Sequence, residues 1–273
     1  MPVTTRDDLS IWYAVEGRER GPGLAGTGAA ASPLVLIQGL GYTADLWYRV
    51  LPGLSEPRMT IRLDNRGVGR SSVPEPPWTV AEMADDVIEV LDAAGLERAH
   101  VFGVSMGGLI AQELVLRHPH RVDRLVLGAT HPGGPEAVRM DPAAATMLMD
   151  RTPRPAREII EDSLAFLYAE STTRDDIDGD VRARMRYPLR AKAYWGQLDA
   201  MRAYEGTLPR LGEVQAPTLV IHGTADRLVQ PANAEVLAGA IPGATLEWFP
   251  GAGHLFWTDQ PDRTVATVNR FLS

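Results

Sequence analysis

The sequence predicts an α/β protein with a mostly parallel sheet, and two patterns in the chain indicate this fold class. Short apolar runs alternate with amphipathic helical patterns through residues 1–131, and the same alternation returns after residue 210. Most of these runs are predominantly apolar, as in strands that are buried on both faces. Chains in which strands and helices alternate in this way form parallel sheets covered by helices on both faces.

The apolar runs set the predicted strands. They cover residues 9–15, 34–37, 59–63, 99–104, 122–128, 218–222 and 245–249. The segment 17–33 is rich in Gly and Ala, which predicts a flexible surface loop before the second strand.

The predicted helices rest on caps and on helical periodicity. Thr79 and Glu82 have the spacing of a capping box, and Gly95 ends the helix that this box begins. The other helices are expected after a cap at Asp45, over residues 106–118, after Pro231 and over residues 261–271.

Residues 132–209 interrupt the alternation. They contain no strand pattern, and helical patterns lie near residues 156–169, 181–187 and 189–204. A helical block between two halves of one sheet is most simply a cap over the strand ends, where ligands bind in such sheets. We therefore expect a core of residues 1–131 and 210–273 and a helical cap of residues 132–209.

Composition restricts the classes of function. The chain has 273 residues, a net charge of −8 and no cysteine. The negative charge makes nucleic acid an improbable partner, and the lack of cysteine excludes disulfides, thiolate catalysis and cysteine-based metal sites. No H-E-x-x-H motif or carboxylate cluster indicates a metal, and we expect no cofactor. No basic and apolar leader and no run of about 18 apolar residues is present, so we expect a cytoplasmic protein that does not enter membranes.

Ser105 is the candidate nucleophile. It stands in Gly103-x-Ser105-x-Gly107, between the predicted strand 99–104 and the helix that follows. This is the nucleophile-elbow pattern in the strand–turn–helix context that it requires. The tight turn forces unusual backbone angles on the serine, and the flanking glycines remove the Cβ atoms that would clash with the neighbouring strand and helix.

A serine hydroxyl needs a base within hydrogen-bond reach, and the base needs a carboxylate that orients it. His254 follows the strand 245–249, and Asp226 follows the strand 218–222. Asp226 alone could be a turn residue, but its place after a strand and between Ser105 and His254 favours the catalytic role. His222 is predicted to be a buried structural histidine.

Five motifs together resemble the α/β-hydrolase fold family, over nearly the whole chain. They are Gln38-Gly39-Leu40-Gly41, Asp64-x-Arg66-Gly67-x-Gly69-x-Ser71, Gly103-Val104-Ser105-Met106-Gly107-Gly108, His222-Gly223-x-x-Asp226 and Gly253-His254. The resemblance implies an eight-stranded sheet, acyl transfer to Ser105, and an oxyanion hole made by the backbone N–H groups of Leu40 and Met106. Some relatives place the acid after the preceding core strand. At that position this chain reads Gly128-Ala129-Thr130-His131, which contains no carboxylate.

The candidates for the substrate pocket are Gln38, Tyr42, His131, Tyr194 and Trp195. Gln38 stands where many relatives have histidine, and it either orients its loop or contacts substrate; we favour the first. Tyr194 and Trp195 are adjacent in the predicted cap, where one ring can face the sheet edge while the other packs within the cap.

These observations predict a cofactor-free serine hydrolase that cleaves a carboxylic ester or lactone of a small, largely apolar substrate through an acyl-enzyme. Two alternatives stay open within the same fold, a hydrolase of C–C bonds and a thioesterase. A third belongs to another class, a ligand-sensing protein on a hydrolase scaffold. The expected partner is a small molecule, and the expected state is a monomer or a small homo-oligomer.

Overall fold

The computed structural model describes residues 3–6, 9–17, 31–150, 152 and 154–273, so most of the predicted loop 17–33 lies outside the described residues. The centre of the fold is an eight-stranded sheet with the order β1-β2-β4-β3-β5-β6-β7-β8. The strands are β1 (Val3–Arg6), β2 (Leu9–Glu16), β3 (Leu34–Ile37), β4 (Thr60–Leu63), β5 (Ala99–Val104), β6 (Val122–Gly128), β7 (Thr218–Gly223) and β8 (Thr245–Phe249). The predicted eight-stranded sheet is confirmed.

Six strands, from β3 to β8, run parallel to one another, and β1 and β2 are antiparallel at one edge. The central strands β3 and β5 are buried at every position. Their largely apolar sequences suit this place, because helices cover both faces of a parallel sheet.

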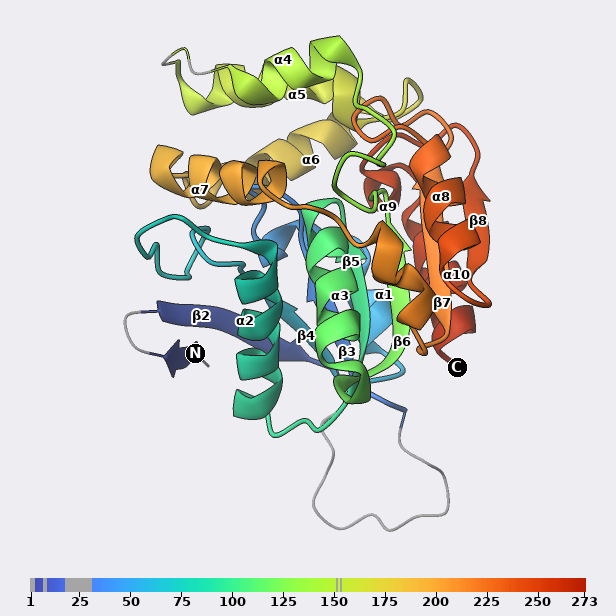
Figure 1. Ribbon diagram of the computed structural model, residues 1–273. Helices are drawn as coiled ribbons and strands as arrows, with labels where there is room; N and C mark the ends of the chain where they lie inside the picture. Colours follow the sequence, from blue (N-terminus) through green and yellow to red (C-terminus); the bar gives the residue numbers. More distant parts are fainter. Residues whose placement is uncertain (1–2, 7–8, 18–30, 151, 153) are drawn as a thin grey trace.

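The helices form a layer on each face of the sheet (Figure 1). One layer holds α2 (Val80–Ala93), α3 (Met106–Arg117) and α8 (Ala232–Ala240). The other holds α1 (Leu51–Ser55) and α10 (Pro261–Leu272), with α9 (Phe256–Asp259) beside them. The predicted capping box of α2 is present, since Thr79 and Glu82 exchange side-chain and backbone hydrogen bonds.

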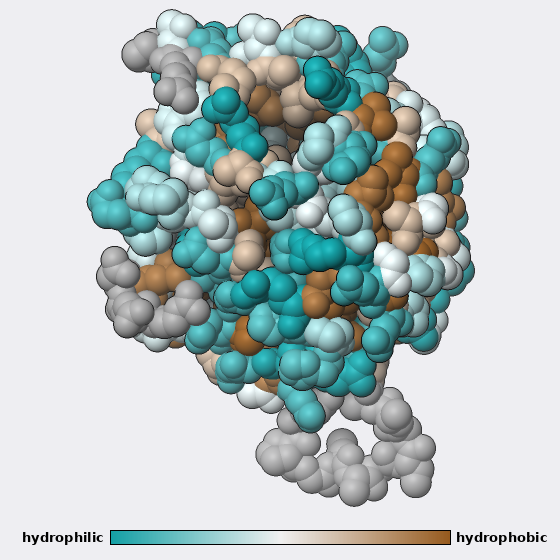
Figure 2. Space-filling model, viewed as in Figure 1, coloured by the Kyte–Doolittle hydropathy of each residue, from teal (hydrophilic) through white to brown (hydrophobic). Residues whose placement is uncertain are grey.

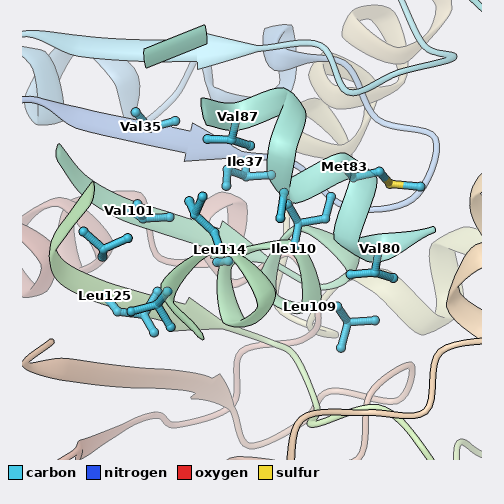
Figure 3. Close-up of a cluster of buried hydrophobic side chains, with 14 of the residues drawn as sticks. Val35, Ile37, Val80, Met83, Val87, Val101, Leu109, Ile110, Leu114 and Leu125 are labelled. Carbon is cyan, nitrogen blue, oxygen red and sulfur yellow. The ribbon is translucent and has the colours of Figure 1, made fainter. Parts of the chain in front are cut away.

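A hydrophobic core fills the space between α2, α3 and the sheet (Figure 3). Val35, Ile37 and Val101 project from the strands toward Ile110 and Leu114 of α3, and all five side chains are fully buried. Burial of apolar surface stabilises the fold by about 25 cal/mol per Å². This core fixes the position of α3, and with it the turn that carries Ser105.

Within the described residues, four α-helices lie between β6 and β7 and gather beyond the carboxyl ends of the parallel strands (Figure 1). They are α4 (Pro142–Met149), α5 (Ala156–Leu167), α6 (Arg174–Met185) and α7 (Ala191–Arg202). The two ends of this segment meet, because Thr207 N–H donates a hydrogen bond to Pro132 C=O at 2.8 Å. The division into a core and a cap of residues 132–209 stays a prediction that this junction favours.

Several elements differ from the sequence prediction. Helix α4 has no clear apolar stripe, and β1 is a four-residue edge strand, so periodicity did not reveal either. Helix α6 begins earlier than predicted because the Thr173 side chain caps it by accepting from Asp176 N–H. The predicted cap at Asp45 is wrong: this residue lies inside the 3-10 turn Ala44–Trp47, where its carboxylate accepts from Arg62 and Arg70.

None of the helices in the described ranges is long and apolar enough to cross a membrane.

Candidate active site

Ser105 lies at the turn between β5 and α3 with φ 55° and ψ −123°, an angle pair that L-residues rarely adopt. Neighbouring glycines make this turn possible. A Cβ added at Gly103 would lie 2.2 Å from the carbonyl oxygen of Gly107, and one at Gly107 would lie 2.3 Å from that of Ile37. Because strain of this kind persists only where the surrounding structure enforces it, the turn is typical of a functional site. Ser105 itself is partly exposed to solvent.

The elbow is anchored on both sides of the serine. Ser105 N–H donates to the carbonyl oxygen of Gly128 on β6 at 3.0 Å, and Thr130 Oγ1 donates to the Ser105 carbonyl oxygen at 2.7 Å. The backbone of the candidate nucleophile is therefore held by the neighbouring strand.

Asp226 and His254 lie together after β7 and β8, as the sequence predicts. His254 Nδ1 is 2.9 Å from Asp226 Oδ2, and both side chains are almost completely buried. Asp226 Oδ1 accepts from Leu228 N–H at 2.8 Å and from Val229 N–H at 2.9 Å. These bonds fix the carboxylate, which in turn fixes the imidazole.

The pKa of Asp226 is lowered to about 2. Burial acts against this shift by raising the pKa, but the charge of His254 and the hydrogen bonds from His222 and His254 outweigh burial. Asp226 is therefore ionised near neutral pH and accepts the proton on His254 Nδ1. In the neutral imidazole this leaves Nε2 unprotonated, the form that a general base requires.

His222 is the second histidine at Asp226, and the sequence pointed to it only as a structural residue. It is fully buried, and its Nε2 lies 3.1 Å from Asp226 Oδ2 and 3.0 Å from the carbonyl oxygen of Val229. Both neighbours are acceptors, so Nε2 carries the proton and donates. His222 therefore helps to hold the carboxylate, in agreement with a structural role.

The loop that contains His254 is tied to neighbouring elements. Gly253 N–H donates to Asp259 Oδ2 at 2.7 Å, and Leu255 N–H donates to the carbonyl oxygen of Leu167 at the end of α5 at 2.8 Å. Ser105 and His254 make no hydrogen bond with each other, although the structure describes both. Catalytic hydrogen bonds are often long in unliganded enzymes and shorten when substrate binds.

The predicted oxyanion-hole donors are the backbone N–H groups of Leu40 and Met106. Met106 is the first residue of α3, where helix N–H groups lack intrahelical partners, and Leu40 lies in the loop after β3. Neither N–H donates a hydrogen bond within the described part of the chain. A Cβ added at Gly39 would lie 3.0 Å from Ser105 Cβ, so this loop passes directly against the serine.

Gln38 is fully buried at the start of this loop. Its Oε1 accepts from Gly39 N–H at 3.3 Å, and its carbonyl oxygen accepts from Asn65 Nδ2 at 2.9 Å. These contacts fit the loop-orienting role that we favoured, and a contact with substrate stays a prediction.

Residues 38–41, named the oxyanion loop after their proposed role, are followed directly by Tyr42; Tyr194 lies beside this loop and contacts Trp195. A Cβ added at Gly41 would lie 3.7 Å from Tyr194 Cδ2, and the rings of Tyr194 and Trp195 meet edge to face at 5.1 Å. The Arg184 guanidinium lies over the Tyr42 ring at 4.7 Å. Tyr194 also donates from its hydroxyl to the carbonyl oxygen of Leu148 at 2.9 Å, which ties α7 to α4.

A hollow between the α4–α5 pair and the α6–α7 pair has apolar residues at its upper edge and in its depth, with hydrophilic residues at its sides (Figure 2). Partly buried residues of these helices include Met147, Leu164 and Ile177. An apolar hollow beside the carboxyl ends of the strands is typical of a small-molecule site.

His131 follows β6 between the strand ends that carry Ser105 and Asp226. Its Nδ1 accepts from Gly133 N–H at 3.0 Å, which places the proton of the neutral ring on Nε2. Its pKa is lowered to about 4, mainly by burial and in smaller part by the charges of His254 and His222. His131 is thus a neutral donor at neutral pH, and its contact with substrate stays a prediction.

Within the described residues, no group of three or more His, Asp or Glu side chains converges as a metal site would require.

Comparison with known families now adds to this geometry. A family model described as the alpha/beta hydrolase fold matches residues 32–261. The chain belongs to the α/β-hydrolase fold family. The resemblance that the five motifs indicated is confirmed, and hydrolase activity is supported by the family and by the names of its relatives.

The relatives of this α/β-hydrolase carry several hydrolase names. A protein of Variovorax paradoxus (strain S110), provisionally named carbamate hydrolase RutD, is 33% identical over 83% of this chain and 86% of its own length. The poly(3-hydroxyalkanoate) depolymerase of Ectopseudomonas oleovorans is 28% identical over 88% of this chain and 84% of its own. The enol-lactonase from Burkholderia xenovorans LB400 superposes with a TM-score of 0.84, at 26% identity over 99% of both chains.

Proposed function

We propose that this chain is a serine hydrolase of carboxylic esters or lactones and that Ser105, His254 and Asp226 form its catalytic triad. The substrate is a small, largely apolar molecule that binds between the sheet edge and a cap of residues 132–209. Tyr42, His131, Tyr194 and Trp195 are the proposed pocket residues. The lactonase and depolymerase names among the relatives support this class of bond.

In the first half of the reaction, Ser105 Oγ attacks the substrate carbonyl carbon and its proton passes to His254 Nε2. Asp226 holds the imidazole in the required tautomer and stabilises the imidazolium. The carbonyl oxygen becomes negatively charged, and the N–H groups of Leu40 and Met106 donate to it. Such donors are effective because they are in place before the charge develops.

The tetrahedral intermediate then releases the alkoxide, which takes the proton from His254. In a lactone this alkoxide stays attached to the acyl group. Water next attacks the acyl-enzyme while His254 accepts its proton. Collapse of the second intermediate releases the carboxylic acid and returns the proton to Ser105.

One observation carries the proposal: the buried 2.9 Å contact between His254 Nδ1 and Asp226 Oδ2, at the same sheet edge as the strained turn of Ser105. An ionised carboxylate held by two backbone N–H groups serves no packing purpose that an apolar residue would not serve better. It does what the base of a serine nucleophile needs.

The test is covalent labelling. A fluorophosphonate should modify wild-type protein at Ser105 alone, as peptide mapping by mass spectrometry would locate. Ser105→Ala should prevent labelling and abolish hydrolysis of p-nitrophenyl acetate, by a factor on the order of a million, as for nucleophile removal in a well-studied protease. An unchanged circular dichroism spectrum serves as the folding control.

An alanine variant that still hydrolyses the ester would contradict the assignment. A panel of esters, lactones, thioesters and diketones then separates the proposed activity from that of a thioesterase or a C–C bond hydrolase. A ligand-sensing protein would bind members of the panel without turning them over.

A further inference from the structure

Gln197 of α7 is fully buried, and both ends of its amide hydrogen-bond to loops of the sheet core. Its Oε1 accepts from Gly41 N–H at 2.8 Å, and its Nε2 donates to the carbonyl oxygen of Arg66 at 2.9 Å. The two partners are 156 and 131 residues away in the sequence. Nothing in the sequence pattern distinguishes this glutamine from the others in the chain.

Gly41 belongs to the oxyanion loop, directly after Leu40. It has φ 73°, and Tyr42 N–H donates to the carbonyl oxygen of Gly39 at 3.3 Å. Leu40 therefore lies between two fixed peptide groups, one held by the turn and one held by Gln197. The Leu40 N–H belongs to the planar peptide group between Gly39 and Leu40. Because the peptide group between Leu40 and Gly41 is held as well, the Leu40 N–H has little freedom to rotate.

The second partner closes a bridge between two loops. Arg66 lies in the loop after β4, next to Asn65, whose side chain donates to the carbonyl oxygen of Gln38 at 2.9 Å. The loop after β4 thus holds the beginning of the oxyanion loop through Asn65, and it holds the end through Gln197. The side-chain amides of Asn65 and Gln197 therefore hold the two ends of the oxyanion loop.

Helix α7 packs closely on the sheet core. A Cβ added at Gly196 would lie 2.7 Å from the Trp78 ring, and one at Gly67 would lie 3.0 Å from Ala193 Cβ. In α4, by contrast, only Ala144 is buried. The close packing of α7 keeps Gln197 in a fixed position relative to the two loops that it contacts.

We propose that Gln197 is a positioning residue of the oxyanion hole, so that α7 is part of the catalytic centre as well as part of the cap. The inference rests on the proposed function, since it takes the Leu40 N–H as an oxyanion donor. It assigns Gln197 no contact with substrate.

The test is Gln197→Met, which keeps the length of the side chain and removes both hydrogen bonds. Removing a whole oxyanion donor costs about 100- to 1,000-fold in kcat, and a loosened donor should cost less, about 10- to 100-fold. KM for p-nitrophenyl acetate should change little. If this variant does not fold, Gln197→Asn keeps an amide that is too short for both partners and should show the same pattern with a smaller loss.

A second readout separates positioning from general destabilisation. A trifluoromethyl ketone adds to the serine oxygen and places a tetrahedral oxyanion in the hole. Its affinity for the Gln197 variant should fall in proportion to kcat/KM, as expected for a transition-state analogue. The affinity for the product carboxylic acid should stay close to that of the wild type.

Asn233→Leu is the matched control. Asn233 is a buried amide of α8 that bonds both backbone groups of Val138, at 2.8 and 3.0 Å, away from the oxyanion loop. Its replacement should lower the melting temperature but leave kcat unchanged. The inference fails if Gln197→Met keeps kcat/KM within about twofold of an active wild type, or if Asn233→Leu loses as much kcat. A wild type that is neither labelled at Ser105 nor active on esters would instead refute the proposed function.

Discussion

The proposed mechanism divides the site into two sides. The acid–base side consists of Asp226 and His254, titratable side chains that hydrogen-bond to each other, and the oxyanion side consists of the backbone N–H groups of Leu40 and Met106. The acid–base side is held within the sheet core, by Val229, Leu228 and His222 around one carboxylate. The oxyanion side is held from a distance, by Asn65 and by Gln197 of α7. Charge fixes the first side, and neutral hydrogen bonds to the backbone fix the second.

This difference changes what a substitution removes. On the acid–base side, one side chain carries the chemistry, and its loss removes a function directly. On the oxyanion side, the donors are backbone groups that no substitution deletes, so variants act only through the geometry of the loop. We therefore expect larger effects from the first side than from the second.

The largest effect on the acid–base side should come from Asp226→Asn. The amide no longer fixes the tautomer of His254, and kcat should fall by about 10,000-fold, as for the corresponding change in a serine protease. Steady-state hydrolysis of p-nitrophenyl acetate measures it.

Asp123→Asn is the control for this prediction. Asp123 lies on β6, the strand after which some relatives place their acid, and it pairs with Arg98 at 2.9 Å. Its replacement should leave kcat nearly unchanged. A large loss from Asp123→Asn and none from Asp226→Asn would show that Asp226 is not the acid of the triad, and would contradict the proposed acid–base side.

A smaller effect is expected from Trp195 of α7, one of the proposed pocket residues. Trp195→Ala should change the discrimination between a bulky aromatic ester and an acetate ester by about 1–3 kcal/mol, the usual contribution of apolar shape in a pocket. Labelling of Ser105 by a small phosphonate should keep its wild-type rate. Gln197→Met tests whether α7 positions the oxyanion loop, and Trp195→Ala tests whether it lines the pocket.

The melting temperature decides how a Trp195 result is interpreted. Equal losses on both esters at an unchanged melting temperature would assign Trp195 to the catalytic centre. A large drop in melting temperature would make it a core residue and place the pocket wall elsewhere.

The last effect concerns stability at low pH and leaves turnover aside. The pKa of His131 lies at about 4 in the folded protein, mainly because of burial. As the pH falls below about 6.5, the unfolded chain takes the proton first, so the free energy of unfolding decreases until the pH reaches the folded pKa. His131→Asn should make this decrease shallower by at most about 1.4 kcal/mol per pH unit.

His100 provides the comparison for His131. It lies near the start of β5, far from Ser105 along the strand, and burial also lowers its pKa to about 4. His100→Asn should likewise make the free energy of unfolding decrease less steeply over the same pH range, without changing kcat. Urea unfolding between pH 4 and 7 tests both variants, and an unchanged slope in both would contradict the assigned pKa shifts.

The sheet, Ser105 and the Asp226–His254 contact could be predicted because each leaves a local mark. Continuous apolar runs indicate buried strands, and the elbow needs glycine at fixed offsets from Ser105. Asp226 and His254 stand just after strands, and parallel strands bring their carboxyl ends together.

Gln197 could not be predicted, because its role depends on the distance between α7 and two remote loops. Periodicity also placed α6 too late, since its start is fixed by the Thr173 cap rather than by an apolar stripe. The neutral state of His131 depends on a Gly133 N–H two residues away and on burial, and only the folded arrangement shows both.

The most direct measurement is rapid chemical quench of wild-type protein mixed with a p-nitrophenyl ester, followed by peptide mapping. The proposed mechanism predicts a burst of nitrophenol and an acyl group on the peptide that contains Ser105, at that residue and no other. Steady turnover with no covalent acyl intermediate, or with the acyl group on a different side chain, would contradict it.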